Sequence, residues 1–558
     1  MRSYDEIVTR NDFADFLGIS HSKLTYVLYT LKPDNCYTEF TIPKRNGGCR
    51  EISAPNPKLK VIQKRLATVL WQRQRDVWES KRISPNLSHA YQKKKGIITN
   101  ATVHRNKRFV LNLDLKDFFA SFHFGRVLGF FEKNKDFQLP HEVAVVIAQL
   151  ACYKGCLPQG APSSPIITNL ICQVLDIRLL ILAKKYKLDY TRYADDLTFS
   201  TNRKDFPDVQ DTFMDEISHE ISKAGFSINE SKTRLQFRDS RQEVTGLTVN
   251  KKVNVNRRFA KDTKAMAHQL YSTGGFLING EQGTLNQLEG RFSFIHQLDK
   301  HNNELNGTKK AAYHPCCREK AYREFLFYRY FFVNELPLIL TEGVTDVSYI
   351  KAALKKFYND YPKLISKEKS GAFSFRVSFF RRSDRWEDLF DMSTDGADAM
   401  RTLCRFFTGK KSAVNYFKTF HDDYGLKQSM PVILLFDNET ESDRPLQVFL
   451  KENSIGEKGK ADLIANLYLR LLPNSKLFLL TNPLVNGKKE CEIEDLFPAE
   501  LLALELGGKK FCRKDKFDKT KYYGKKIFSQ YVLENYQSID FSGFRPLLDA
   551  LNRIVAST

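Results

Sequence analysis

The sequence predicts two parts: a first part in which β-hairpins are interspersed with long helices, and a second, α/β part built on a parallel sheet. The chain has 558 residues, long enough for two or three domains. In the second part, apolar strands alternate with amphipathic helices, which is the pattern of a parallel sheet. The chain is 42% hydrophobic and 13% aromatic, and this composition excludes extended disorder.

The positive charge of the chain lies mainly in the first part. The net charge is +22, of which +18 precedes Phe331 and +4 follows. Surplus Lys and Arg attract polyanions through counterion release, so the first part is the better candidate for a nucleic-acid contact, although a solvated basic surface has the same composition. No uncharged apolar stretch approaches the roughly 20 residues of a membrane span, and the first residues lack the pattern of a secretion signal. We therefore expect a cytoplasmic protein without a membrane partner.

Alternation, turn residues and apolar spacing predict the elements of the first part in order. A helical lead-in reaches about residue 31, and a basic hairpin over 37–55 turns at Arg45–Gly48. An amphipathic basic helix follows over 58–78. Beyond it we expect the following elements: a strand over 108–115, helices over 141–153 and 166–186, two short strands within 191–201, a helix over 208–224, a strand over 226–237, a hairpin over 243–256 and a helix over 258–273.

Three carboxylates stand at the ends of strands in this part. Asp114 ends an apolar strand, while Asp195 and Asp196 occupy a turn between two short strands about eighty residues later. An Asp-Asp turn by itself is commonly a solvated turn. Two carboxylate sites at strand ends also suit a pair of Mg²⁺ ions roughly 4 Å apart, which is the arrangement that transfers phosphoryl groups between nucleotides.

Three motifs resemble those of reverse transcriptases, in the same order and spacing. RYADDLTFS resembles the YxDD box, LNLDLKDFFASF the first metal-binding motif, and LPQGAPSSPIITNL the nucleotide-pocket motif. The resemblance implies an α+β right-hand polymerase with fingers, palm and thumb over roughly residues 20–310. It also implies that Asp114 and Asp195 are the principal Mg²⁺ ligands, with Asp196 as the third carboxylate.

The same resemblance assigns residues that bind the substrate. Gln159 would contact the incoming deoxynucleotide, and Phe119 would be a steric gate against a ribose 2′-hydroxyl. Gly160 would permit close backbone approach. Lys232 resembles a lysine of a later palm motif that supports the metal site.

The basic hairpin offers cations for a triphosphate. Flexible ammonium groups and forked guanidinium groups both bind phosphate oxygens. The candidates are Lys44, Arg45 and Arg50, whose alternative interpretation is an exposed charged hairpin.

Two further segments resemble features of retron reverse transcriptases, namely Asn100-Ala101 with His104, and Val244-Thr245-Gly246. Such enzymes bind a cognate structured noncoding RNA, prime from a 2′-hydroxyl within it, and make a branched RNA-linked DNA called msDNA. Taken alone, the Val-Thr-Gly segment is an ordinary hairpin strand with a glycine, and His104 is a surface or packing histidine.

The second part places acidic residues after two apolar strands. Glu342 follows the strand LPLILT and precedes a helix that carries Asp346, while Asp437 and Glu439 follow PVILLF. If these strands are parallel neighbours, the carboxylates meet at one edge of the sheet, where they could bind Mg²⁺. Single acidic residues at strand ends more commonly cap helices.

This pattern, LTEGVTD followed by LLFDNE, resembles the Toprim domain, and it departs from the usual Asp-x-Asp because Glu439 occupies the last position. The later run CEIEDLFP offers Glu492, Glu494 and Asp495 as further ligands, or as a solvated helix start. Nuclease activity is the Toprim chemistry that we favour.

The predicted domains are 1–310 for the reverse transcriptase, 311–334 for a linker, 335–500 for the Toprim domain and 501–558 for a C-terminal extension. This order resembles bacterial retrons that fuse a polymerase to a Toprim effector in antiphage defence. The implied partners are the cognate RNA and its msDNA, deoxynucleotides, an RNA or DNA target of the nuclease, and a second copy in a homo-oligomer. The alternatives are a group II intron-like polymerase and a non-catalytic Toprim-like scaffold.

Overall fold

The computed structural model describes residues 3–44, 47–83, 87–307, 315–393, 396–439, 444–485, 487–514 and 516–557. The chain divides into two compact units. One comprises Met1–Arg257 and Leu298–Gly307, and the other comprises Arg258–Gln297 and Thr308–Thr558.

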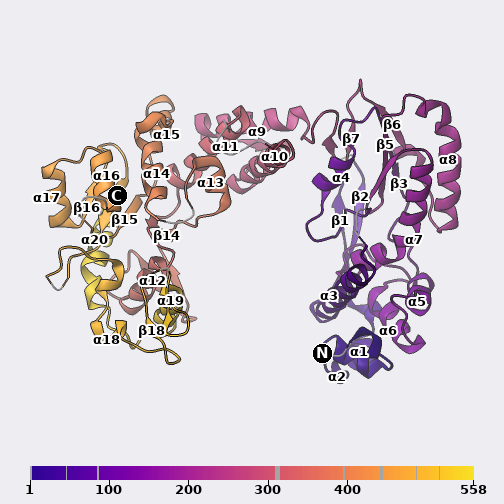
Figure 1. Ribbon diagram of the computed structural model, residues 1–558, viewed down its shortest axis with the longest axis horizontal. Helices are drawn as coiled ribbons and strands as arrows, with labels where there is room; N and C mark the ends of the chain where they lie inside the picture. Colours follow the sequence, from indigo (N-terminus) through magenta and orange to yellow (C-terminus); the bar gives the residue numbers. More distant parts are fainter. Residues whose placement is uncertain are drawn as a thin grey trace. The chain divides into compact units, whose positions relative to one another are not determined.

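An antiparallel sheet in the order β4-β5-β3-β6 forms the centre of the first unit (Figure 1). The apolar strand β3, Phe109–Asp114, is almost entirely buried and pairs with β5, Asp196–Thr201, and with β6, Arg234–Phe237. β4, Asp189–Tyr193, forms a tight hairpin with β5. The expected strand over 226–237 is confirmed only at its end, because the backbone N–H of Asn229 donates to Asp114 O at 2.7 Å and the chain then turns through Glu230–Lys232.

Two smaller hairpins flank this sheet. The predicted basic hairpin is confirmed: β1, Tyr37–Pro43, pairs with β2, Cys49–Pro55. The second hairpin pairs β7, Glu243–Val244, with β8, Leu247–Thr248.

Helices on and around the sheet bury one apolar core with it. The helices of this unit are α1 Arg10–Phe16, α2 His21–Thr25, α3 Pro57–Ser80, α4 Ile97–Val103, α5 Phe124–Lys133, α6 His141–Ala151, α7 Ser164–Lys185 and α8 Phe206–Lys223. Among the described residues, α7 alone is long and apolar enough to cross a membrane, and 61% of its apolar window is buried inside the structure. Asp176 and Arg178 interrupt its apolar sequence, so the segment contains no uncharged stretch as long as a membrane span. Its burial is that of a core helix.

A buried ion pair joins α7 to the strand that precedes the aspartate turn. Arg192 on β4 has no exposed side-chain surface, and its Nε and Nη2 each lie 2.8 Å from an oxygen of Asp176. The same guanidinium donates to Ala194 O at 3.2 Å, and Tyr190 Oη donates to Asp176 at 2.8 Å. Ala194 has a positive φ of 57°, a conformation that residues other than glycine seldom adopt. The hydrogen bond from Arg192 therefore holds the backbone in this conformation where the chain turns into Asp195.

The second unit contains the expected parallel sheet. Its order is β14-β11-β15-β17-β16, and the strands are β11 Leu338–Thr341, β14 Ser378–Phe379, β15 Val432–Phe436, β16 Tyr468–Arg470 and β17 Leu477–Thr481. All neighbours are parallel except β16, which lies antiparallel at one edge. The segment 373–380 forms two short strands, because the backbone N–H of Arg376 donates to Leu364 O at 2.8 Å and is not available to one continuous strand. Its halves are β13, Phe373–Phe375, paired with β12, Ile365–Lys367, and β14. Two-stranded ladders complete the unit: β9 Leu277–Ile278 with β10 Glu281–Gln282, and β18 Lys510–Phe511 with β19 Tyr522–Tyr523.

The second unit also contains helices. They are α9 Arg257–Thr273, α10 Leu285–Leu305, α11 Cys317–Phe327, α12 Asp346–Lys356, α13 Asp384–Phe390, α14 Asp398–Thr408, α15 Tyr416–Lys418, α16 Pro445–Glu452, α17 Glu457–Asn466, α18 Ala499–Leu502, α19 Lys525–Glu534 and α20 Arg545–Ala556. α18 is short and ends at Leu502.

The unit boundaries differ from those expected. The expected linker contains α11, on which Tyr322 stacks against Phe292 of α10 with ring centroids 5.4 Å apart. This aromatic packing joins α9 and most of α10, expected in the polymerase, to the second unit. The expected C-terminal extension is likewise part of the apolar core of the second unit. The ring centroids of Phe528 on α19 and Tyr349 on α12 are 5.8 Å apart, and the two helices lie side by side (Figure 1).

Replacing Arg192 by leucine should destabilise the first unit strongly. The variant leaves the Asp176 carboxylate buried without its cation, which typically costs about 3–5 kcal/mol. Chemical unfolding of the full chain measures the change in free energy. The matched control is Arg178→Leu, on the same helix as Asp176 but at a partly exposed site where Glu220 lies 3.6 Å away, and its expected cost is below about 1 kcal/mol. Equal effects of the two variants would contradict the prediction.

Candidate functional site

The first unit brings its three predicted carboxylates to one end of the central sheet. Asp114 is the last residue of β3 and is paired in register with Asp196, the first residue of β5. The backbone N–H of Leu115 donates to Asp195 O at 3.0 Å, which closes the sheet across the turn. Strand pairing therefore places side chains that are about eighty residues apart in the sequence next to one another.

The carboxylates of this site are crowded, and Asp114 is buried while Asp195 and Asp196 are half-buried. Burial, together with the charges of Asp195 and Asp114, raises the pKa of Asp196 to about 7. Burial is also the main cause of the raised pKa of Asp195, where the cations of Lys232 and Arg50 act in the opposite direction. Loss of hydration, more than repulsion between the carboxylates, therefore makes these groups costly to ionise.

Lys232 and Asn229 hold Asp114 in place. Lys232 Nζ lies 2.9 Å from both carboxylate oxygens of Asp114, and this hydrogen bond is the main cause of the raised lysine pKa. Asn229 Nδ2 donates to Asp114 Oδ1 at 3.2 Å. The sequence identified Lys232 but missed Asn229, which precedes it in the segment NESK and reaches the site only because the chain turns there.

The expected substrate-binding residues lie on segments that contact one another. Ser53 on β2 donates its N–H to Gln159 O at 2.9 Å. Gly160 has φ +128°, and a Cβ there would stand 2.8 Å from Ser53 O, so this position requires glycine. Its close approach is to the hairpin β1–β2. Phe119 is half buried, with its ring edge-on to Phe118 at 5.5 Å.

The hairpin places one of its three predicted cations within electrostatic range of the carboxylates. Arg50 on β2 is close enough to lower the pKa of Asp195, although burial outweighs it. Lys44 is exposed next to the end of β1, and Arg45 lies outside the described residues.

The carboxylates of the first unit fit Mg²⁺ by their chemistry. Within the residues that the structure describes, no group of three or more His, Cys, Asp or Glu side chains is arranged as it stands to hold a metal ion. Mg²⁺ in nucleotide-handling sites is usually bound by one or two carboxylates together with water and substrate phosphates. Two hard oxygen ligands at adjacent strand ends are therefore a suitable protein contribution.

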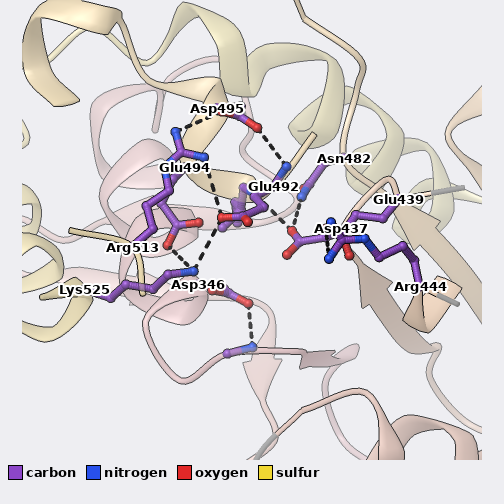
Figure 2. Close-up of polar contacts among 12 residues, drawn as sticks. Asp346, Asp437, Glu439, Arg444, Asn482, Glu492, Glu494, Asp495, Arg513 and Lys525 are labelled. Atoms are coloured by element: carbon purple, nitrogen blue, oxygen red, sulfur yellow. Dashed lines mark hydrogen bonds and ion pairs between the residues drawn. The ribbon is translucent and has the colours of Figure 1, made fainter. Parts of the chain in front are cut away.

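A second acidic cluster lies at the carboxyl edge of the parallel sheet in the other unit. β11 and β15 are parallel neighbours with Thr341 beside Leu435, so Glu342 and Asp437 leave the sheet at the same edge, as predicted. The backbone N–H of Asp437 donates to Glu342 Oε1 at 3.0 Å. Figure 2 shows Asp437 facing Asn482, whose Nδ2 donates to Asp437 Oδ1 at 2.7 Å. Asn482, which follows β17, was missed by the sequence analysis.

Asp346 completes an inner group with Glu342 and Asp437. It accepts the N–H of Gly343 at 2.7 Å, and a Cβ on Gly343 would stand 2.8 Å from Asp346 Oδ1. Burial raises the pKa of Glu342 and of Asp346 to about 7 each. Burial, followed by the charges of Glu342 and Asp346, raises the pKa of Asp437 well above its usual range. Among the ion pairs of the described residues, none joins these three carboxylates to a cation.

The outer carboxylates of this cluster are ion-paired. Glu439 lies 3.3 Å from Arg444, although it is also near enough to raise the pKa of Glu342, for which burial is the main cause. Glu494 is fully buried and lies 3.0 Å from Lys525. Figure 2 shows these two pairs on either side of Asp346 and Asp437.

Asp495 and Glu492 are also paired. Asp495 lies 2.9 Å from Arg513 and 2.8 Å from Lys488, and Glu492 lies 3.5 Å from Arg513. Arg513 and Lys525 come from the segment that the sequence analysis treated as an extension, so this segment contributes directly to the cluster.

Comparison with known proteins places the first of these sites in a family. The family profile described as "Reverse transcriptase (RNA-dependent DNA polymerase)" matches residues 42–252, a range that contains Asp114, Asp195 and Asp196. The Retron Ec86 reverse transcriptase of Escherichia coli is 34% identical over 293 residues, which cover 52% of this chain and 84% of that protein.

The region shared with other retron reverse transcriptases covers a smaller part of their length. The Retron Mx162 reverse transcriptase of Myxococcus xanthus is 33% identical over 327 residues, which cover 53% of this chain and 64% of that protein. The chain likewise spans 62% of the Retron Mx65 reverse transcriptase. A solved telomerase structure from Candida albicans is similar at a TM-score of 0.31 and 15% identity, covering 52% of this chain and 58% of that one.

The identity shared with the Escherichia coli protein extends over most of its length, and the profile match includes all three carboxylates at the strand ends of the first unit. The chain has the reverse transcriptase fold in this part and belongs to the retron reverse transcriptase family.

Proposed function

We propose that the first unit is an RNA-directed DNA polymerase that copies a cognate structured noncoding RNA into branched, RNA-linked single-stranded DNA. Synthesis would begin from a 2′-hydroxyl of that RNA. The observation that carries the proposal is the in-register pairing of Asp114 with Asp196, which brings three carboxylates to one sheet end. Family membership and the net charge of +18 before Phe331 support a long contact with RNA and DNA.

Each residue of the site has a proposed task in this reaction. Asp114 and Asp195 would hold Mg²⁺, with Asp196 as the third carboxylate. When bound, Mg²⁺ would favour deprotonation of the attacking hydroxyl and balance charge on the leaving pyrophosphate. Lys232, with its Nζ 2.9 Å from both oxygens, keeps Asp114 oriented.

The substrate-binding residues would act on the deoxynucleotide. Gln159 would orient it, and Gly160 keeps the pocket loop close to β2. Phe119 would exclude a ribose 2′-hydroxyl. Lys44, Arg45 and Arg50 would supply cations for the triphosphate.

Asp195→Asn should abolish DNA synthesis while leaving the fold intact. The change removes one charge and one anionic ligand without altering side-chain volume, and the loss of activity should be at least about 100-fold. The measurement is Mg²⁺-dependent DNA synthesis by the full chain on its copurifying RNA, with sequencing of the product.

The control for this variant is Asp215→Asn on the exposed face of α8, which should retain full activity. The wild-type product should be one DNA sequence joined to RNA. Unbranched DNA of mixed sequence would instead favour the group II intron-like alternative, and synthesis by Asp195→Asn would remove the assigned role.

We further propose that the second unit is a Toprim-like, Mg²⁺-dependent nuclease acting on RNA or DNA. The supporting observation is the inner group of Glu342, Asp346 and Asp437, in which Asp346 is buried, the other two are half-buried, and none has an ion pair among the described residues. Buried charges of one sign without a partner are costly, and a divalent cation would relieve that cost. The fusion would act in antiphage defence in the bacterial cytoplasm, with the polymerase and its product restraining the nuclease.

A specific observation favours the alternative of a non-catalytic scaffold. Glu439, which replaces the second aspartate of the usual pattern, is paired with Arg444 at 3.3 Å, and Glu494 is paired with Lys525 at 3.0 Å. These cations occupy carboxylates that a second metal ion would need. Under this alternative the unit would bind nucleic acid or a second copy without cleaving.

Asp437→Asn separates the two interpretations. If the unit is a nuclease, the full chain freed of its copurifying RNA and DNA should cleave mixed RNA or DNA in Mg²⁺, and the variant prepared in the same way should lose at least about 100-fold of that activity. DNA synthesis by the first unit should be unchanged. The control is Glu500→Gln, an exposed residue of α18. Absence of cleavage by the wild type, or cleavage that survives in both Asp437→Asn and Glu342→Gln, would support the scaffold.

A further inference from the structure

Two motifs of the first unit lie away from the carboxylates and contact each other. The first motif lies on α4 and its C-terminal cap, and consists of Asn100, Ala101 and His104. His104 follows Asn100 by four positions and Ala101 by three, so the three residues share one helix face. All three are fully buried. A fully buried side chain cannot contact a nucleic acid in this conformation, so the motif has an internal task.

The hydrogen bonds of His104 connect the helix to two strands. Its Nε2 lies 2.8 Å from Thr191 Oγ1 on β4, and its Nδ1 lies 2.7 Å from Ser200 Oγ on β5. Thr191 Oγ1 in turn donates to Asn100 Oδ1 at 2.6 Å. We call these four residues the α4 brace.

The directions of these hydrogen bonds define which nitrogen of the His104 ring carries a proton. The single hydroxyl proton of Thr191 is donated to Asn100, so Thr191 must accept from Nε2–H of His104. Burial lowers the pKa of His104 to about 3, so the ring is neutral and its Nδ1 accepts from the Ser200 hydroxyl. The network is therefore directional, with each of its bonds using a specific donor.

The α4 brace holds the two strands that carry the aspartate turn. Thr191 precedes Asp195 by four positions, and Ser200 follows Asp196 by four positions. β4 and β5 are paired as far as Tyr193 and Asp196, so they meet the turn as one rigid hairpin. Fixing the hairpin at Thr191 and Ser200 fixes the direction in which it presents the turn.

The Val244-Thr245-Gly246 motif supports the same helix. Thr245 and Gly246 have φ values of +47° and +79°, which is the pattern of a two-residue type I′ turn between β7 and β8. Threonine is β-branched and seldom has a positive φ, so this conformation is strained. In this conformation Thr245 Oγ1 donates to Ile97 O, in the first turn of α4, at 3.4 Å.

The hairpin is also tied to the sheet. Asn112 on β3 donates its Nδ2 to Glu243 O at 2.8 Å and accepts from Thr198 Oγ1 on β5 at 3.1 Å. The β7–β8 hairpin thus contacts both α4 and the strand that ends at Asp114.

We propose that His104 is a positioning residue, which acts through Thr191 and Ser200 to hold Asp195 and Asp196 in register with Asp114. The β7–β8 hairpin holds α4 in place for this purpose. The proposal rests on the polymerase function proposed above, and misplacing a metal-binding carboxylate by about 1 Å is enough to lower a rate by about 100-fold.

The test uses the full chain and three variants. His104→Leu removes both hydrogen bonds, and His104→Gln keeps one donor and one acceptor. His219→Leu, on the exposed face of α8, is the matched control. The measurements are kcat and KM for deoxynucleotide on a primed RNA template, the active fraction from the burst amplitude, RNA affinity, and amide hydrogen exchange over residues 189–201.

His104→Leu should lower kcat per active molecule by about 100-fold with RNA affinity within about two-fold of wild type, and His104→Gln should restore part of the rate. Exchange over 189–201 should become faster in His104→Leu and stay unchanged in His219→Leu. A normal kcat per active molecule, a selective loss of RNA affinity, or unchanged exchange in His104→Leu would overturn the proposal. If the wild type makes no DNA, the polymerase assignment fails, and the exchange comparison still decides whether His104 holds the hairpin.

Discussion

The concentration of carboxylates at the ends of strands is the constraint on which both units depend. Like charges that are buried together repel one another and lose hydration, and the raised pKa values of Asp196 and Glu342, each about 7 with burial as the main cause, record this cost. Such groups stay together only if the backbone that carries them is held firmly. In each unit a buried sheet does this, because register pairing sets which residues meet at its edge.

The two units balance this charge in different ways. In the first unit, the ammonium group of Lys232 contacts Asp114. The Arg192–Asp176 ion pair and the α4 brace stabilise the strands that lead into and out of the aspartate turn. In the second, cations pair with the outer carboxylates and leave the inner three without ion pairs in the part of the chain that the structure describes. The first arrangement suits the proposed substrate, which would bring phosphates and a metal ion to the site, whereas the second separates an inner group from ion-paired outer carboxylates.

Much of the local structure could be predicted from the sequence because its signals are short-range. The paired strands of the basic hairpin, the apolar run that ends at Asp114 and the strand-helix alternation after residue 335 each depend on neighbouring residues, and each was confirmed. Asn229 and Asn482 were missed because an asparagine in a polar segment carries no signal of its own. Lys525 was assigned to an extension because only packing of α19 on α12 brings it to Glu494.

By itself the sequence determined the element order, the three carboxylates of the first unit and the acidic residues after two strands of the second, since strand periodicity and motif spacing are properties of the chain. Tertiary structure alone decided where the units divide, because aromatic packing of Phe292 on Tyr322 joins the part of α10 before Leu298 to the second unit. It also decided the task of His104, which a sequence shows as an ordinary histidine. Burial and hydrogen-bond partners come from segments about ninety residues away, and no local pattern records them.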